Sequence, residues 1–185
     1  YTGNDSELLV LSKKLLKKDG TTKLRAIQDL STVLKTKSES TISEFLSYYV
    51  YCFPRLSIED QRSVREQLGN VLTSIVSVEK RLLAPHMKAL IGPWWMLTGD
   101  PASEVAESAM SAYNSAIPPK KRQPVLAYLG PSIIAEAAKN IRHRPETLSD
   151  LSVTTAAEAS ERLERVLASS IASMSKLVSM LTIEQ

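Results

Sequence analysis

Apolar residues recur three and four positions apart along almost the whole chain, a spacing that places them on one face of successive helices. The helices fall into pairs that recur about every 40 residues, a period typical of HEAT and armadillo repeats. The predicted pairs cover 6–37, 41–77, 78–117 and the region 120–181. No window sustains the two-residue alternation of a strand, so the pattern indicates helices throughout.

This pattern predicts an all-α, HEAT/ARM-like helical-repeat solenoid of about four helical pairs. A single pair cannot bury its apolar faces alone, so neighbouring pairs must stack. We expect residues 1–185 to form a single HEAT-like repeat domain that is a fragment of a longer chain, because Tyr1 replaces an initiator Met and the end follows an apolar helical run. Hydrophobic residues make up 43% of the chain and aromatic residues only 5%, so aliphatic side chains and Ala must dominate the core.

Capping and helix-breaking residues set the expected helix boundaries. The expected caps are Ser6 for the first helix, Thr21 or Thr22 for the second, Ser57 with Asp60 for the fourth, and Asp100 with Pro101 for the sixth. The expected interruptions are Pro54 after a third helix over 41–52, Pro85 and Pro93 within a fifth over 78–97, and Gly130-Pro131 between helices at 120–128 and 131–142. A loop over 143–153 and a last helix over 154–181 complete the chain.

Two further expectations concern the core. One ring of Trp94-Trp95 should enter the core, and the other should lie in the core, at the neighbouring repeat or at a partner, with the core favoured. The last helix should bury one apolar stripe, made of Leu163, Val166, Leu167, Met174, Leu177, Val178 and Leu181.

Charge is distributed unevenly along the chain, although the net charge is only +3. Residues 1–37 carry +4 and residues 120–144 carry +5, whereas 38–119 and 145–185 each carry −3. Such asymmetry favours an anionic partner, and the alternative is an ordinary solvated helix surface. The candidate binding residues are Lys13, Lys14, Lys17, Lys18, Lys23, Arg25, Lys120, Lys121 and Arg122. No aromatic residue is interleaved with them, which favours contact with phosphate backbone or acidic protein over base stacking.

Residues typical of catalytic and metal sites are scarce. The chain has one cysteine, Cys52, and two histidines, His86 and His143, so no metal-ligand cluster of usual spacing and no internal disulfide is possible. It lacks the nucleophile elbow of serine hydrolases and both glycine-rich phosphate motifs. No apolar stretch reaches the length of a membrane span. We therefore expect a binding module in a reducing compartment, with no catalytic residue, cofactor or metal and no membrane or DNA partner.

Several sequence blocks resemble the N-terminal region of the listerin family of RING-type E3 ubiquitin ligases. The first is Leu11-Ser12-Lys13-Lys14-Leu15-Leu16-Lys17-Lys18-Asp19, followed by Thr21-Thr22-Lys23-Leu24-Arg25-Ala26. Others are Leu83-Ala84-Pro85 with Lys88, Leu90 and Trp94, then Ala116-Ile117-Pro118-Pro119-Lys120, and Glu146-Thr147-Leu148-Ser149-Asp150. The blocks occur in the family's order over about 10–150, and the one noted departure, Arg25 for Lys, keeps the charge.

The resemblance implies a role in ribosome-associated quality control in the cytosol. The parent protein would recognise a stalled large (60S) ribosomal subunit and ubiquitylate the nascent chain. Its N-terminal domain would dock on the intersubunit face near the sarcin-ricin loop, where it meets a protein of the nuclear export mediator factor family. The RING, with its zinc, would lie at the far C-terminus, outside this chain. The alternative is a helical-repeat scaffold that binds an acidic protein unrelated to ribosomes.

Overall fold

The computed structural model describes residues 1–182, which form helices and loops with no strand in that range. The α-helices are α1 (Ser6–Leu15), α2 (Gly20–Val33), α3 (Glu39–Ser57), α4 (Arg62–Glu79), α5 (Met87–Leu97), α6 (Ser103–Ala116), α7 (Arg122–Ile141), α8 (Pro145–Leu148) and α9 (Ala156–Thr182). The 3-10 helices are η1 (Leu34–Thr36), η2 (Lys80–His86) and η3 (Pro119–Lys121). The predicted all-α repeat architecture is confirmed.

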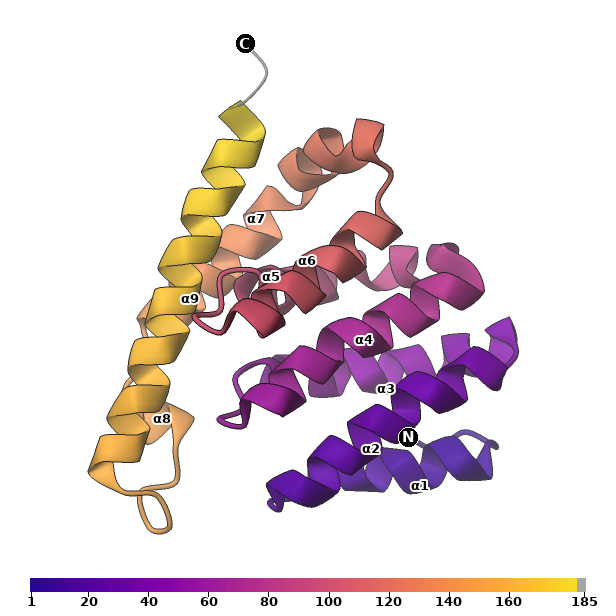
Figure 1. Cartoon of the computed structure of the whole chain (residues 1–185), viewed down its shortest axis with the longest axis horizontal. Coiled ribbons are helices and arrows are strands. Elements are labelled where there is room, and N and C mark those ends of the chain that lie inside the picture. Colours follow the sequence, from indigo (N-terminus) through magenta and orange to yellow (C-terminus); the bar gives the residue numbers. More distant parts are fainter. Residues whose placement is uncertain (183–185) are drawn as a thin grey trace.

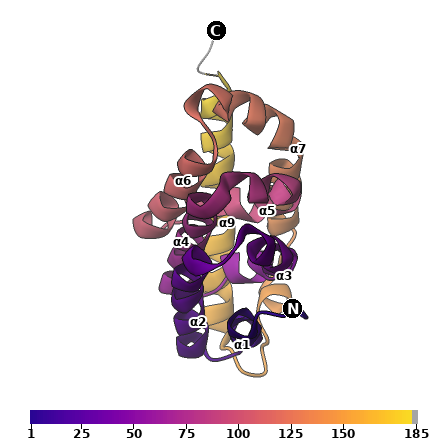
Figure 2. The ribbon, with the colours of Figure 1, turned by 90° about the vertical axis from the view of Figure 1, so that its right-hand side faces the viewer.

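The helices stack in two layers (Figures 1 and 2). We call α1, α3, α5 and α7 the A layer, in which α3 packs on α5 and α5 on α7. The B layer begins with α2, α4 and α6, in which α2 packs on α4 and α4 on α6. One apolar core runs between the layers and includes the fully buried Leu30 and Leu72. This is the stacking that the 40-residue period predicted.

Helix α9 departs from the regular stack. It runs steeply across the other helices along one side of the molecule (Figure 1) and packs on α5 and α7. The Trp95 indole Nε1 donates to the Ser173 carbonyl at 3.0 Å, and Ser173 Oγ donates back to the Trp95 carbonyl at 2.9 Å. Ser173 and Lys176 of α9 thus supply donors to carbonyls at the end of α5, which a helix leaves unpaired.

Both tryptophans lie in the core. Trp94 and Trp95 are fully buried, and the Trp94 Nε1 donates to the Ala109 carbonyl of α6 at 2.9 Å. On α9 the predicted stripe is buried or half-buried except for Val178, which is 56% exposed. The prediction for Val178 was wrong because α9 packs on the stack through a narrower face than its apolar residues span.

Helix starts differ from the predicted caps. Asp5, not Ser6, caps α1 by accepting from the Leu8 backbone N–H at 2.9 Å, and Asp19 caps α2 by accepting from Thr22 at 2.7 Å. A carboxylate adds a favourable interaction with the helix dipole that a hydroxyl lacks. The predicted Ser57–Asp60 cap is wrong, since Ser57 belongs to α3 and α4 follows Gln61. The sixth helix was expected to start at Asp100 and Pro101, but α6 begins at Ser103, two residues after Pro101.

Prolines interrupt the helices less than predicted. Helix α3 continues through Pro54 to Ser57, and α7 runs unbroken through Gly130-Pro131. Each proline is flanked by buried side chains, such as Phe53 and Leu56 in α3, whose burial offsets the roughly 3 kcal/mol cost of an interior proline. Gly130 removes the side chain that would crowd the ring of Pro131 in a helix. The expected broken start of the fifth helix is confirmed as η2, and the expected loop over 143–153 contains the single turn α8.

Helices α4 and α6 approach closely at Gly69. A Cβ built on Gly69 would lie 2.6 Å from the carbonyl carbon of Ser108, and Ser108 Oγ donates to the Glu66 carbonyl at 2.8 Å. The backbone of α6 therefore occupies the space that any side chain at this position would need.

We predict that Gly69→Ala destabilises the protein by about 1–3 kcal/mol, because α6 must move away from α4. Gly20→Ala is the matched control, since its Cβ would meet only the end of the flexible Gln61 side chain. Urea unfolding followed by circular dichroism measures both, and equal stability of the two variants would contradict the close packing.

Stability should also fall on acidification through the two caps. The pKa of Asp5 lies below its usual value because the carboxylate accepts from Leu8 and Lys37, and Thr22 lowers the pKa of Asp19 in the same way. A carboxyl whose pKa is lower in the folded state contributes stability above its unfolded pKa of 3.8 and loses it as pH falls through the folded value. The wild type should therefore lose its stability advantage over the double variant Asp5→Asn/Asp19→Asn below about pH 4. Unfolding midpoints between about pH 7 and pH 3 test this, and a constant difference would contradict it.

Candidate interaction surface

The loops between helices lie on two opposite edges of the stack (Figure 1). The AB edge consists of the loops that lead from an A-layer helix to the next helix of the B side, at 16–19, 58–61, 98–102 and 142–155. The BA edge consists of the loops that return to the A layer, at 34–38, 80–86 and 117–121. A partner that contacts one edge therefore faces a different set of side chains from a partner at the other.

The BA edge is uniformly basic. It contains six Lys or Arg and no Asp or Glu. The AB edge contains four Lys or Arg and six Asp or Glu. Lys37 is held by Asp5 at 2.9 Å and Glu7 at 2.8 Å. The other five cations are exposed and form no ion pair within residues 1–182: Lys35, Lys80, Arg81, Lys120 and Lys121. The charge of this edge is therefore available to an external anion.

The predicted N-terminal basic residues lie at the end of α1 and in the 16–19 loop. We call Lys13, Lys14, Lys17 and Lys18 the N-terminal lysine cluster. All four are exposed, as is Arg25 on α2, and none of the five forms an ion pair in the described part of the chain. The structure thus separates this cluster from Lys120 and Lys121, which lie on the opposite edge.

Two of the predicted binding residues have partners inside the fold. Lys23 is 8% exposed and its ammonium binds the Glu59 carboxylate in the 58–61 loop. Arg122 is half-buried, and its guanidinium donates to the carbonyls of Ile117 at 3.2 Å and Asn114 at 3.1 Å, at the end of α6. Both side chains hold neighbouring elements together, so Lys23 lies inside the fold and Arg122 is only partly open to solvent.

A buried ion pair stands at the centre of the AB edge. The Arg65 guanidinium on α4 donates from Nε to Asp100 Oδ2 at 2.8 Å and from a terminal nitrogen to Asp100 Oδ1 at 3.1 Å. Another terminal nitrogen donates to the carbonyls of Glu59 at 2.7 Å and Asp60 at 2.8 Å. The two side chains are only 3% and 2% exposed. Arg65 therefore joins the 58–61 loop to the 98–102 loop.

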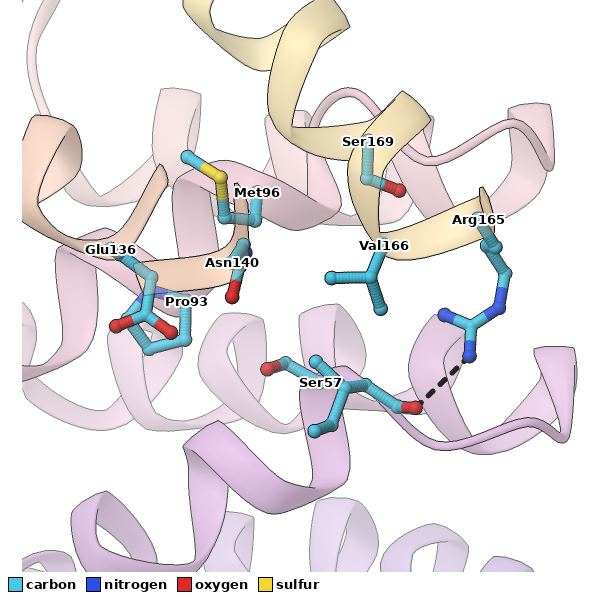
Figure 3. Close-up of a pocket in the computed structure, with 9 residues that line it drawn as sticks. Ser57, Pro93, Met96, Glu136, Asn140, Arg165, Val166 and Ser169 are labelled. Carbon is cyan, nitrogen blue, oxygen red and sulfur yellow. Dashed lines mark hydrogen bonds between the residues drawn. The ribbon is translucent and has the colours of Figure 1, made fainter. Parts of the chain in front are cut away.

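Helix α9 is tied to the same loop by two arginines. Arg162 Nε donates to Asp60 at 2.6 Å, and Arg165 donates to Asp60 at 3.3 Å and to the Ile58 carbonyl at 3.0 Å. Figure 3 shows Arg165 reaching that carbonyl at the side of a narrow crevice, which Pro93, Met96, Asn140 and Val166 also line. Burial, followed by the charge of Arg65, lowers the pKa of Arg165.

Cys52 and His143 are among the few side chains of the chain that could act as a nucleophile, a base or a metal ligand. Cys52 is fully buried, and burial raises the pKa of its thiol, so it is a poor nucleophile. Burial lowers the pKa of His143, whose Nδ1 lies 3.0 Å from Thr147 Oγ1. Residues 1–182 contain no group of three or more His, Cys, Asp or Glu that could hold a metal. The arrangement offers surfaces for binding.

Sequence reasoning missed the basic residues of η2. Lys80 and Arg81 are exposed on the BA edge, beside the loop that carries Lys120 and Lys121. The two pairs are 40 positions apart in the sequence, which is one repeat. Equivalent positions of successive repeats lie on the same edge of a solenoid, so this spacing could have revealed the shared edge.

Comparison with known proteins decides the family. The family model of the E3 ubiquitin-protein ligase listerin, N-terminal domain, matches residues 4–185. The chain belongs to the listerin N-terminal domain family. Listerin of Schizosaccharomyces pombe is 32% identical over 177 residues, or 95% of this chain, and listerin of Gallus gallus is 29% identical over 178 residues, or 96%. The chain spans 11% and 10% of the lengths of these two relatives.

Solved structures show the same fold for this listerin domain. Two crystal structures of engineered proteins match it with a TM-score of 0.54 and 17% sequence identity over 96% of the chain. The matches cover 40% and 71% of those engineered chains. At this identity the likeness concerns the fold alone. In residues 1–182, none of the helices combines the length and apolarity needed to cross a membrane.

We predict that Asp100→Ala destabilises the domain by about 3–5 kcal/mol, because it leaves the buried Arg65 charge without its carboxylate. Glu104→Ala is the control, since Glu104 pairs with Arg62 at 3.2 Å on the surface and both side chains are at least half exposed. An exposed pair of this kind contributes little, so the control should keep the unfolding midpoint of the wild type. Chemical denaturation measures both, and a wild-type midpoint for Asp100→Ala would contradict the role of the buried pair.

Proposed function

We propose that this listerin N-terminal domain docks its parent ligase on stalled large (60S) ribosomal subunits, so that the nascent chain is ubiquitylated. The domain binds and does not catalyse, and ubiquitin transfer belongs to a RING, with its zinc, outside this chain. The docking takes place in the cytosol. A protein of the nuclear export mediator factor family is the second partner.

The N-terminal lysine cluster is the observation that carries the proposal. Four lysines lie within six residues, all are exposed, and all are free of ion pairs within residues 1–182. On the same edge Glu59, Asp60 and Asp100 are bound by Lys23, Arg65, Arg162 and Arg165, so these three carboxylates are engaged within the fold. The surface of a ribosomal subunit is rich in phosphate, which such a cluster binds with release of counterions.

The two edges support separate contacts. Lysines of the N-terminal cluster meet rRNA phosphates, and Arg25, which is exposed on α2 near Asp19, adds to their charge. Lys120 and Lys121, on the BA edge, cannot reach the same patch of a partner. They contribute to long-range attraction of an anionic particle and contact a second surface.

Reversal of the cluster to Glu (Lys13→Glu, Lys14→Glu, Lys17→Glu, Lys18→Glu) should strongly reduce co-sedimentation of the domain with purified 60S subunits. Each phosphate contact contributes roughly 0.9 to the slope of log affinity against log salt concentration. The slope of the wild type should therefore be about 3 to 4 units steeper than the slope of the variant. Circular dichroism and thermal unfolding should match the wild type, because these side chains are exposed.

A charge-matched control reverses Lys80, Arg81, Lys120 and Lys121 instead. It changes the net charge equally and should reduce subunit binding less, through loss of long-range attraction alone. Wild-type affinity and slope for the cluster variant at about 50 and 200 mM salt would exclude the cluster as the rRNA contact. A wild-type domain that binds acidic proteins and no subunit would favour the scaffold alternative.

A further inference from the structure

A groove opens on the BA edge between η2 and the 117–121 loop. Its floor is apolar. It is formed by η2 and the start of α5, by the end of α6 and the loop that follows, and by α7. The residues that line it are Lys80, Arg81, Leu83, Ala84, Met87, Ala116, Ile117, Pro118, Lys121 and Val125. Leu83, Met87 and Ala116 form a buried base, while Ile117 and Val125 are half-buried and partly open to solvent.

The charged residues at the rim of the groove are all basic. Lys80, Arg81 and Lys121 are exposed, Lys120 adjoins them, and no lining residue is acidic. The nearest carboxylate in the sequence, that of Glu79, accepts from the Arg81 backbone N–H at 2.8 Å and so caps η2. None of the four cations forms an ion pair within residues 1–182. An occupant must therefore bring its own negative charge.

We propose that this groove binds an acidic protein segment that inserts an aliphatic or aromatic side chain between flanking Asp or Glu residues. The side chain would cover Leu83, Ile117 and Val125, and the carboxylates would pair with Lys80, Arg81 and Lys121. Partial desolvation by the apolar floor strengthens such pairs relative to exposed ones.

The floor favours protein over RNA as the occupant. Single-stranded bases bind by stacking on aromatic rings and by hydrogen bonds to their edges. The lining residues include no aromatic ring and no neutral polar side chain, so the groove offers neither interaction along its floor. An aliphatic surface of this kind suits the side chain of Leu, Ile, Met or Phe instead.

This inference goes beyond ribosome docking and does not depend on it. The groove and the N-terminal lysine cluster lie on opposite edges, so either contact can be lost while the other remains. Figure 2 views the stack from the BA-edge side. The residues that line the groove belong to η2, α5, α6, α7 and the 117–121 loop on that side.

Peptide binding tests the proposal directly. The probes are four fluorescent peptides, each with four acidic residues around one anchor, which is Leu, Ile, Met or Phe. Two peptide controls are used: one replaces the anchor by Ser, and the other replaces each acid by its amide. An oligouridylate of equal charge serves as the RNA control. Fluorescence anisotropy should show at least one anchored acidic peptide bound about tenfold more tightly than either peptide control. Amide shifts in the NMR spectrum should be confined to the groove, at Leu83, Lys121 and Val125.

A matched pair of variants at one exposed position controls for folding and sterics. Ala84 lies at the rim, so Ala84→Glu should weaken peptide binding about tenfold, whereas Ala84→Lys, of similar length, should preserve it. The reversed N-terminal cluster should bind the peptide as the wild type does, which separates this result from subunit docking. Three outcomes would overturn the proposal: no anchored peptide preferred over its Ser control, equal binding by the two Ala84 variants, or oligouridylate shifting the same amides.

Discussion

The buried pair between Arg65 and Asp100 is the interaction on which the rest of the structure depends. One guanidinium binds the carboxylate of the 98–102 loop and two carbonyls of the 58–61 loop, and so fixes the second repeat on the third. The 58–61 loop is held in turn by Lys23 from the first repeat and by Arg162 and Arg165 from α9. A charge buried this deeply stabilises the fold only when its donors are satisfied, and here the 58–61 and 98–102 loops supply the acceptors.

This network also decides which charges can act outside the domain. On the AB edge Glu59, Asp60 and Asp100 are bound by internal cations, whereas Lys17 and Lys18 of the N-terminal lysine cluster are exposed and form no ion pair within residues 1–182. On the BA edge the lysines have almost no carboxylates to pair with, and an apolar groove lies among them. The domain therefore carries two chemically different surfaces on opposite edges, an exposed lysine cluster and an apolar groove with a basic rim.

Local rules predicted the helices well and their ends less well. The period of the apolar residues gave the repeat pairs and buried positions such as Val166 and Leu177 on the last helix. Pro54 and Pro131 were expected to end helices, yet both lie inside them, because burial of side chains on either side outweighs a local penalty. Candidate lysines were identified as a class, but Lys23 could not be recognised as internal, because its partner Glu59 is 36 residues away.

The sequence by itself determined the helical class, the 40-residue repeat, the family and the presence of two basic segments. The family follows from the order of the sequence blocks that resemble it, and the other three follow from spacing or composition along the chain, which folding does not change. The tertiary structure alone decided that Lys23 and Arg122 hold the fold together, that Lys80 and Arg81 join Lys120 and Lys121, and that the N-terminal cluster faces away from them. These outcomes depend on which loops share an edge and on which acids the packing brings to each cation, and stacking sets both.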